Sequence, residues 1–460
     1  MAYVKAQADY LNIVSSRTVS AKADSVLKEL LTIRERKAGT RKVYYPSPDF
    51  ISYDSMLMLD YPAQITSLSI TNIKTKRLPK EVFNCNQLQF LELVNTPIRN
   101  LQKLKKLPHL KSVYILNSKS LKPIRLSKTG GIKSFGMRGE NPAALPRSFH
   151  QVSKLEKLDL ADNRLTHFPT GIKKNLLLKE ILLSNNHITL EDGRMEESAS
   201  LEKLELQKNK IITIPSAIKG YPNLKKLTLS YNAIEKVSDE ISTLSKLEHL
   251  AFYHNNLTSI PDGIFKLKDL KDIDLYFNRI ERMDNRLGKL KSLEVLYLSN
   301  NKLISIPDSI GSLTNLRELY LSNNRLSDLP QSLGKLHELK VLRLNNNYLL
   351  QFPEYLLKLS KLENIDISNN KITELPEYVS SLQQLKLLVM VNNPWDSQSL
   401  ERLPKLTEQL RKKEVVVHAR LGRNLEFRLL CRNLGFVLLF PFSFFSVFVL
   451  LAHQLKFSLL

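Results

Sequence analysis

The sequence predicts an α/β solenoid, a curved horseshoe with a parallel β-sheet on its concave face and short helical or 3-10 turns on its convex face. Three observations support this. Residues 296–303 read LYLSNNKL and residues 319–326 read LYLSNNRL, so one octet recurs after 23 positions. The same step continues from Leu155 to Leu385 without slippage, and an Asn recurs at one place in every copy. A fixed period of this length indicates a repeat array whose units pack on their neighbours.

Each unit follows the template L-x-x-L-x-L-x-x-N-x-L-x-x-I/L-P-x-x-I/L-x-x-L-x-x. The L-x-L core alternates with period two, as strands do, so Leu296 and Leu298 point inward and Tyr297 points outward. Strands of successive units should stack about 4.8 Å apart in one sheet. We expect the third, fifth, seventh and eighth places to point outward from the concave face. Degenerate copies begin upstream at Ile65, Leu88, Leu110 and Ile132, which gives 15 units in all.

The second half of each unit, such as IPDSIGSL, spaces its apolar residues by three, which predicts a short helical or 3-10 turn. Most units hold Pro at the fifteenth place, and three hold Asp192, Ser238 or Asp284 instead. Pro suits the start of a helix because its missing N–H costs nothing there, and Asp or Ser can cap one. Each convex turn therefore begins with a start signal.

The recurrent Asn occupies the ninth place, where the chain turns inward and its backbone N–H and C=O groups need partners. A side-chain amide both donates and accepts, so a stacked column can satisfy neighbouring units. We interpret the column as a structural ladder rather than as surface turn residues. Its members are Asn163, Asn186, Asn209, Asn232, Asn255, Asn278, Asn301, Asn324, Asn347, Asn370 and Asn393.

This template resembles the leucine-rich repeat superfamily in its 23-residue intracellular form. It is similar to the Ras-group-related repeat proteins and to the leptospiral leucine-rich repeat proteins. The resemblance covers about three-quarters of the chain and implies the leucine-rich-repeat horseshoe fold together with a binding surface. It specifies the function poorly, because one fold serves many functions.

The remaining segments frame the repeats. An apolar helical face over 18–39 predicts a cap for the open N-terminal end, and ERLPKLTEQLRKKE at 401–414 predicts a second cap. The domains we expect are an N-terminal flank with helical cap (1–64), degenerate basic repeats (65–154), regular repeats (155–396), a C-terminal cap with basic linker (397–432) and a hydrophobic segment (433–455).

The hydrophobic segment, residues 433–455, contains no Lys, Arg, Asp or Glu and is long enough to cross a bilayer as a helix. Basic residues precede it, which predicts a tail anchor that leaves the solenoid on the cytoplasmic side. Two other interpretations stay open: an unselected tail, and a cap folded back on the last repeat. Cys85 and Cys431 lie far apart, and no disulfide cluster or apolar leader is visible, so we expect a reducing, cytoplasmic environment. Export by a route without a signal peptide stays open.

Positive charge is concentrated in the degenerate repeats. The chain carries a net charge of +23, and residues 65–154 contain 17 Lys or Arg against 3 acids. Such a block could attract nucleic acid, phospholipid or an acidic protein. It lacks interleaved stacking aromatics and any DNA-reading module, which argues against nucleic acid. Solvated lysines are the simplest interpretation, and an anionic-surface binder (nucleic acid or phospholipid) is the alternative function.

Catalysis finds no support in the sequence. The nine histidines are scattered, and no metalloprotease, P-loop, nucleophile-elbow or paired Cys motif occurs. We therefore expect no enzyme activity and no cofactor. A metal site at the adjacent His249 and Asp272 is a weaker explanation than a solvated hydrogen bond.

The outward columns of the eighth to thirteenth units are rich in aromatic residues, which are enriched in protein interfaces. We expect a monomeric, non-catalytic scaffold that binds a protein partner of unknown identity on this concave patch. A purely structural explanation, that aromatics favour strands, stays open. The candidate partner-binding residues are Tyr231, His249, Tyr253, His254, Asp272, Asp274, Tyr276, Phe277, Tyr297, Tyr320 and Arg343.

Overall fold

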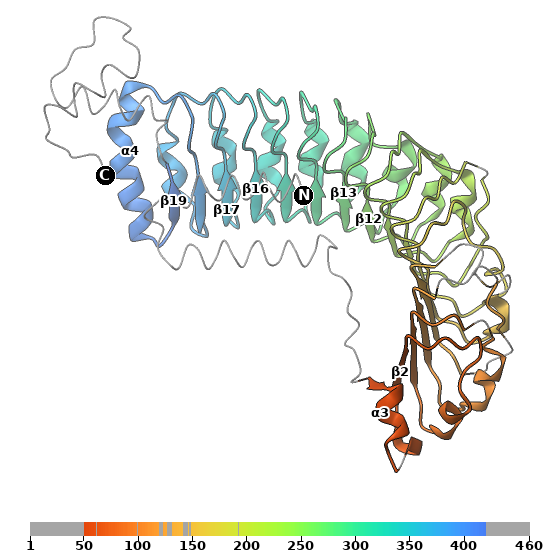
Figure 1. Ribbon diagram of the computed structural model, residues 1–460. Helices are drawn as coiled ribbons and strands as arrows, with labels where there is room; N and C mark the ends of the chain where they lie inside the picture. The colour runs from red at the N-terminus through yellow and green to blue at the C-terminus, as the bar shows by residue number, and fades with distance from the viewer. Residues whose placement is uncertain are drawn as a thin grey trace, which may run out of the picture.

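A computed structural model describes residues 50–419 except 61, 99, 119–122, 127–130, 141–145, 147–148 and 192. The chain forms one long arc with strands along its inner side and short helices along its outer side (Figure 1). The predicted horseshoe is therefore confirmed: a 17-stranded sheet lines the concave face. The predicted N-terminal helix over 18–39 and the segment 433–455 lie outside the described residues.

All strands of the sheet run parallel, and each regular strand covers the third to fifth places of its unit. Neighbouring strands pair with a step of one repeat, as Ile273, Leu296 and Leu319 do. The strands are β1 (Ile51–Ser52), β2 (Ser67–Thr71), β3 (Phe90–Val94), β4 (Ser112–Leu116), β5 (Ser134–Arg138), β6 (Lys157–Asp159), β7 (Glu180–Leu182), β8 (Lys203–Glu205), β10 (Lys226–Thr228), β12 (His249–Ala251), β13 (Asp272–Asp274), β14 (Val295–Tyr297), β15 (Glu318–Tyr320), β16 (Val341–Arg343), β17 (Asn364–Asp366), β18 (Leu387–Val389) and β19 (Val416–His418).

The core is a continuous stack of aliphatic side chains between the sheet and the convex turns. The first, fourth and sixth places of each unit are buried, as Leu293, Leu296 and Leu298 are. Burying one such side chain contributes about 1.5–3 kcal/mol to the stability of the fold, and every unit buries several of these side chains. Because each unit covers the apolar surface of the next, the stack is stable only as an array.

Short 3-10 helices form the convex side, as the spacing of three predicts. Two of the units without Pro use a capping side chain instead: Ser238 accepts a hydrogen bond from the Glu240 N–H, and Asp284 accepts one from the Arg286 N–H at 2.7 Å. The helices are η1 (Pro62–Gln64), η2 (Lys80–Asn84), η3 (Gln102–Lys106), η5 (Phe149–Gln151), η6 (Ser216–Gly220), η7 (Asp239–Thr243), η8 (Asp262–Lys266), η9 (Asn285–Lys289), η10 (Asp308–Ser312), η11 (Gln331–Lys335), η12 (Glu354–Lys358) and η13 (Glu377–Ser381). A second small parallel sheet, β9 (Thr213–Ile214) with β11 (Lys236–Val237), was not expected.

Both ends of the described arc carry an α-helix. At the N-terminal end α3 (Tyr53–Leu57) lies beside β2, and its Ser52 cap accepts a hydrogen bond from the Ser55 N–H. At the C-terminal end α4 (Ser397–Lys412) buries Leu403, Leu406 and Leu410. The chain then adds β19 to the sheet beside β18, where the sequence suggested only a linker. Within the described residues no helix is both long enough and apolar enough to span a membrane.

Candidate functional site

The eighth place of each unit lies beyond the end of its strand, in a left-handed turn. This corrects the expectation that the seventh and eighth places are outward positions of the sheet itself. The φ angle at the eighth place is between 50° and 67° in all 15 units. Nine of these units hold Asn there, and three others hold Asp162, Gly139 and Lys208. Asn, Asp and Gly tolerate a left-handed backbone with little or no penalty.

Three consecutive units place a bulky aromatic ring at this left-handed position. Tyr231, His254 and Phe277 have φ angles of 56°, 56° and 53°. For most residues with a Cβ the left-handed region costs about 1–2 kcal/mol. Strand propensity cannot explain these residues, because they lie outside the strands. The turns that follow the strands, rather than the strands themselves, therefore carry these three rings.

Their rings join those of two neighbours in one cluster, which we call the aromatic patch: Tyr231, Tyr253, His254, Tyr276 and Phe277. Tyr231 meets Tyr253 edge-on with ring centroids 4.9 Å apart, and Tyr253 stacks on Tyr276 at 5.5 Å. Phe277 meets Tyr276 edge-on at 4.7 Å, and His254 stacks on Tyr231 at 5.2 Å. The rings thus support one another across three units.

A second aromatic pair continues the surface toward the C-terminus. Tyr297 and Tyr320 stack with ring centroids 4.7 Å apart, on the adjacent strands β14 and β15. The Tyr320 hydroxyl donates to Glu318 at 2.9 Å. Arg343 follows in the same column and pairs in register with Tyr320 on one side and Asp366 on the other. Arg343 is therefore the candidate farthest from the aromatic patch.

Three of the predicted residues carry polar groups on β12 and β13, the strands that precede two of the turns of the patch. His249 Nδ1 contacts the Asp272 carboxylate on the next strand. Asp274 accepts a hydrogen bond from the Tyr276 N–H at 3.0 Å, which fixes the turn that carries this ring. Among the described residues no group of three or more His, Cys, Asp or Glu is arranged to hold a metal ion.

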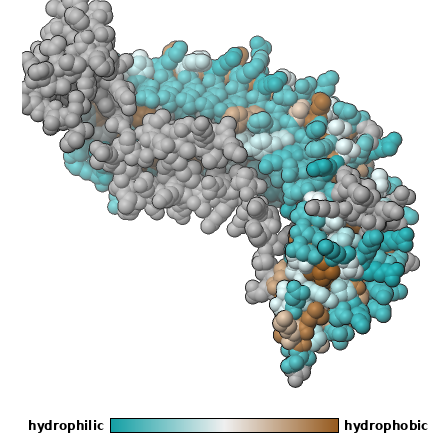
Figure 2. All heavy atoms as spheres, viewed as in Figure 1, coloured by the Kyte–Doolittle hydropathy of each residue, from teal (hydrophilic) through white to brown (hydrophobic). Residues whose placement is uncertain are grey.

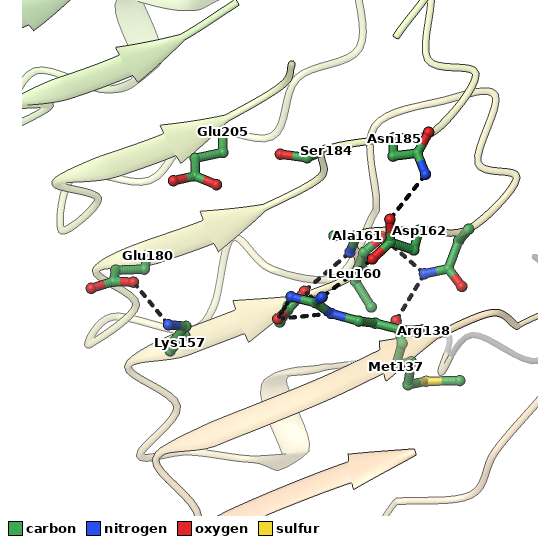
Figure 3. A network of polar contacts seen from close by, with 12 residues as sticks. Met137, Arg138, Lys157, Leu160, Ala161, Asp162, Glu180, Ser184, Asn185 and Glu205 are labelled. Atoms are coloured by element: carbon green, nitrogen blue, oxygen red, sulfur yellow. Dashed lines mark hydrogen bonds and ion pairs between the residues drawn. The ribbon is translucent and has the colours of Figure 1, made fainter. Parts of the chain in front are cut away.

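The concave face differs in the earlier repeats, where charged side chains pair with each other (Figure 3). The Arg138 guanidinium donates to both oxygens of Asp159, the shortest contact being 2.6 Å, and to Asp162 at 3.2 Å. Lys157 pairs with Glu180 at 3.3 Å on the adjacent strand. The concave face over β5 to β8 is therefore lined by paired charges, in contrast to the aromatic patch.

The column of ninth-place asparagines runs behind both the charged and the aromatic parts of the concave face. The Asn301 side chain donates to the carbonyl oxygens of Leu298 at 3.0 Å and Leu275 at 2.9 Å, and it accepts the Ile280 N–H at 2.9 Å. All eleven asparagines donate to the sixth-place carbonyl oxygens of their own and the preceding unit and accept a backbone N–H from the preceding unit. The column ties each unit to the next.

The column continues into the degenerate repeats with other residues, which the sequence analysis missed. Thr96 donates to the Val94 and Ile70 carbonyls, and the buried Glu140 carboxylate accepts from both the N–H and the hydroxyl of Ser118. The Glu140 N–H in turn donates to Asn163 at 2.7 Å. Burial raises the pKa of Glu140, against the effect of its hydrogen bonds from Ser118. Extending the ninth-place register upstream reaches these three positions, but a Thr, Ser or Glu there does not by itself indicate a contact in the column.

Comparison with known families and structures agrees with this architecture. Family models match as a leucine-rich repeat region over residues 216–331, as a BspA-type leucine-rich repeat region over 145–271, as two leucine-rich repeats over 314–356 and as a single repeat over 361–382. No curated protein matches the sequence.

Among solved structures, a leucine-rich repeat protein of Leptospira interrogans is similar, with a TM-score of 0.64 and 26% identity over 81% of this chain and 99% of that chain. A TDR receptor is similar at TM-score 0.54 and 22% identity, over 78% of this chain and 60% of its own. Toll of Drosophila, in complex with Spätzle, is similar at TM-score 0.53 and 20% identity, over 74% of this chain and 55% of its own. The last two similarities concern the fold alone.

Proposed function

The chain belongs to the leucine-rich repeat superfamily, and on that premise we propose that it is a non-catalytic scaffold that binds a protein partner on its concave face. The contact is made by the aromatic patch and by the adjacent Tyr297–Tyr320 pair. The self-paired charges of the earlier repeats flank this surface and discourage contact outside it. Arg343 lies at the far edge of the surface.

One observation carries the proposal: three successive units place an aromatic residue at a left-handed position where nine of the fifteen units hold Asn. Backbone strain of this kind persists where function requires it. Tyrosine and other aromatic rings supply large contact area with little side-chain freedom to lose, and they dominate binding hot spots. A protein surface is the ligand class that matches a ring cluster spread over three repeats.

Similar structures offer a precedent for the class of ligand. Toll of Drosophila is seen in complex with Spätzle. The precedent does not extend to the site, because its similarity to this chain is one of fold.

The test exchanges the three left-handed rings for Asn, the residue that nine other units hold at this place. Tyr231→Asn, His254→Asn and Phe277→Asn together should leave the solenoid folded, because relief of backbone strain offsets the lost ring contacts. A partner captured by the full-length chain and identified by mass spectrometry should bind this variant at least about 100-fold more weakly by calorimetry, about 2.7 kcal/mol or more.

The matched control is Lys157→Ala with Glu180→Ala, on the polar half of the same face. Its affinity for the partner should stay within about threefold of the parent chain. A second variant, with Tyr253, Tyr276 and Tyr320 changed to Ala, should also lose the partner. Unchanged capture by both aromatic variants, with circular dichroism showing intact folding, would remove the concave patch from consideration.

A further inference from the structure

We propose that the N-terminal end of the arc is a second, independent interaction surface that binds membranes containing anionic phospholipid. We call this surface the tip; it comprises Leu57, Met58 and Leu59 at the end of α3 and Lys80, Lys103, Lys105 and Lys106 on η2 and η3. The tip is separate from the aromatic patch, so either proposal can fail without the other.

The apolar part of the tip consists of three consecutive exposed residues. The exposed fractions of Leu57, Met58 and Leu59 are 53%, 85% and 45%. In the space-filling view, hydrophobic residues gather at this end of an otherwise largely hydrophilic surface (Figure 2). An exposed apolar run of this kind marks an interaction site when it adjoins polar or charged residues.

Contacts to the first convex turn hold this run in place. Met56 is buried and its sulfur lies 3.4 Å from the Cys85 sulfur, at the end of η2. The Tyr53 hydroxyl donates to Glu81 of η2 at 3.2 Å. α3 is thereby fastened to η2, and the three exposed residues follow directly after the buried Met56.

The basic part of the tip occupies these convex turns. Lys80 lies on η2, and Lys103, Lys105 and Lys106 lie on η3 of the next unit, with all four side chains exposed. In the described residues the first ion pair along the chain is Lys133–Glu156, beyond both turns. Basic residues of the later repeats, by contrast, commonly pair across units, as Lys271 does with Glu248 at 2.6 Å.

The combination of exposed aliphatic residues and clustered lysines favours lipid over nucleic acid as the ligand of the tip. Clustered lysines are attracted to anionic headgroups, and a neighbouring aliphatic run can enter the boundary between headgroups and acyl chains. A binder of single-stranded nucleic acid instead combines basic residues with stacking rings. Leucine and methionine provide no such rings, so the exposed residues of the tip match a bilayer surface.

The first experiment is co-sedimentation of the full-length chain with vesicles of phosphatidylcholine alone or with 30% phosphatidylglycerol. Binding to the anionic vesicles should be at least about tenfold tighter. Lys103→Glu, Lys105→Glu and Lys106→Glu together should abolish this preference. The control makes the same charge change on η8, η9 and η11, with Lys266→Glu, Lys289→Glu and Lys335→Glu. Its affinity for the anionic vesicles should stay within about threefold of that of the parent chain. Residues 433–455 are present in every variant, so any association that they cause is common to all.

The second experiment follows insertion directly. The chain has one tryptophan, Trp395, which is 5% exposed, so Met58→Trp adds a single reporter at the tip. Its fluorescence should shift to the blue with anionic vesicles and not with neutral ones, and Met58→Glu should weaken vesicle binding. Three outcomes would overturn the proposal: no preference for anionic vesicles, equal losses in the two charge-reversal variants, or tighter binding to a 20-nucleotide RNA that Met58→Glu leaves unchanged.

Discussion

Replacing Asn301 by Ala tests whether the ninth-place column holds successive repeats together. The side chain is 9% exposed and makes three hydrogen bonds of 2.9–3.0 Å to backbone groups of two units. Alanine would leave the Ile280 N–H and two carbonyl oxygens without this partner inside the fold. An unsatisfied buried N–H costs about 1–3 kcal/mol, and an under-satisfied carbonyl costs less. We therefore expect a loss of about 3 kcal/mol in the free energy of unfolding.

Urea unfolding followed by circular dichroism measures this loss. Lys302→Ala is the matched control: it changes the next residue, which is in a 3.6 Å surface ion pair with Glu281, and such pairs contribute about 0–1 kcal/mol. Asn301→Asp keeps the shape and the acceptor but loses both donors and buries a charge, so it should destabilise at least as much as Ala. If Asn301→Ala costs no more than the Lys302 control, the column does not couple the repeats as argued.

Three further predictions concern stability. Because burial raises the pKa of Glu140 above its ordinary 4.5, the contribution of this group to stability falls as the pH rises through the raised pKa. Glu140→Gln should therefore increase the free energy of unfolding at pH 7 by about 1 kcal/mol, and the gain should shrink toward pH 4 in urea titrations; a pH-independent difference would contradict this. Gly311→Ala should lower stability by about 1–3 kcal/mol in the same assay, because a methyl group there would overlap Ser332 on the next convex turn, and an unchanged midpoint would disprove this close approach. Asp284→Ala should cost about 1 kcal/mol by removing the cap on the Arg286 N–H, whereas Asp284→Ser should retain most of it.

Much of the candidate site could be predicted by stepping through the sequence one repeat at a time. Parallel pairing of identical units puts residues 23 positions apart side by side, as Tyr253 with Tyr276 and Tyr297 with Tyr320, and the rings of both pairs do stack. The left-handed backbone beneath Tyr231 was not expected. The periodicity of apolar residues reports which side chains are buried, but it carries no information about the φ angle of an exposed turn.

The sequence by itself determined the repeat, the register of its strands and the buried column of asparagines, because each depends on a local pattern renewed every 23 residues. Only the tertiary structure decided which contacts form at positions that depart from the repeat pattern. Glu140 replaces a ladder asparagine, and β19 extends the sheet after α4. Each depends on contacts with a neighbouring unit that is already folded. A residue or segment that departs from the repeat occurs only once, so the periodicity of the sequence cannot predict its contacts.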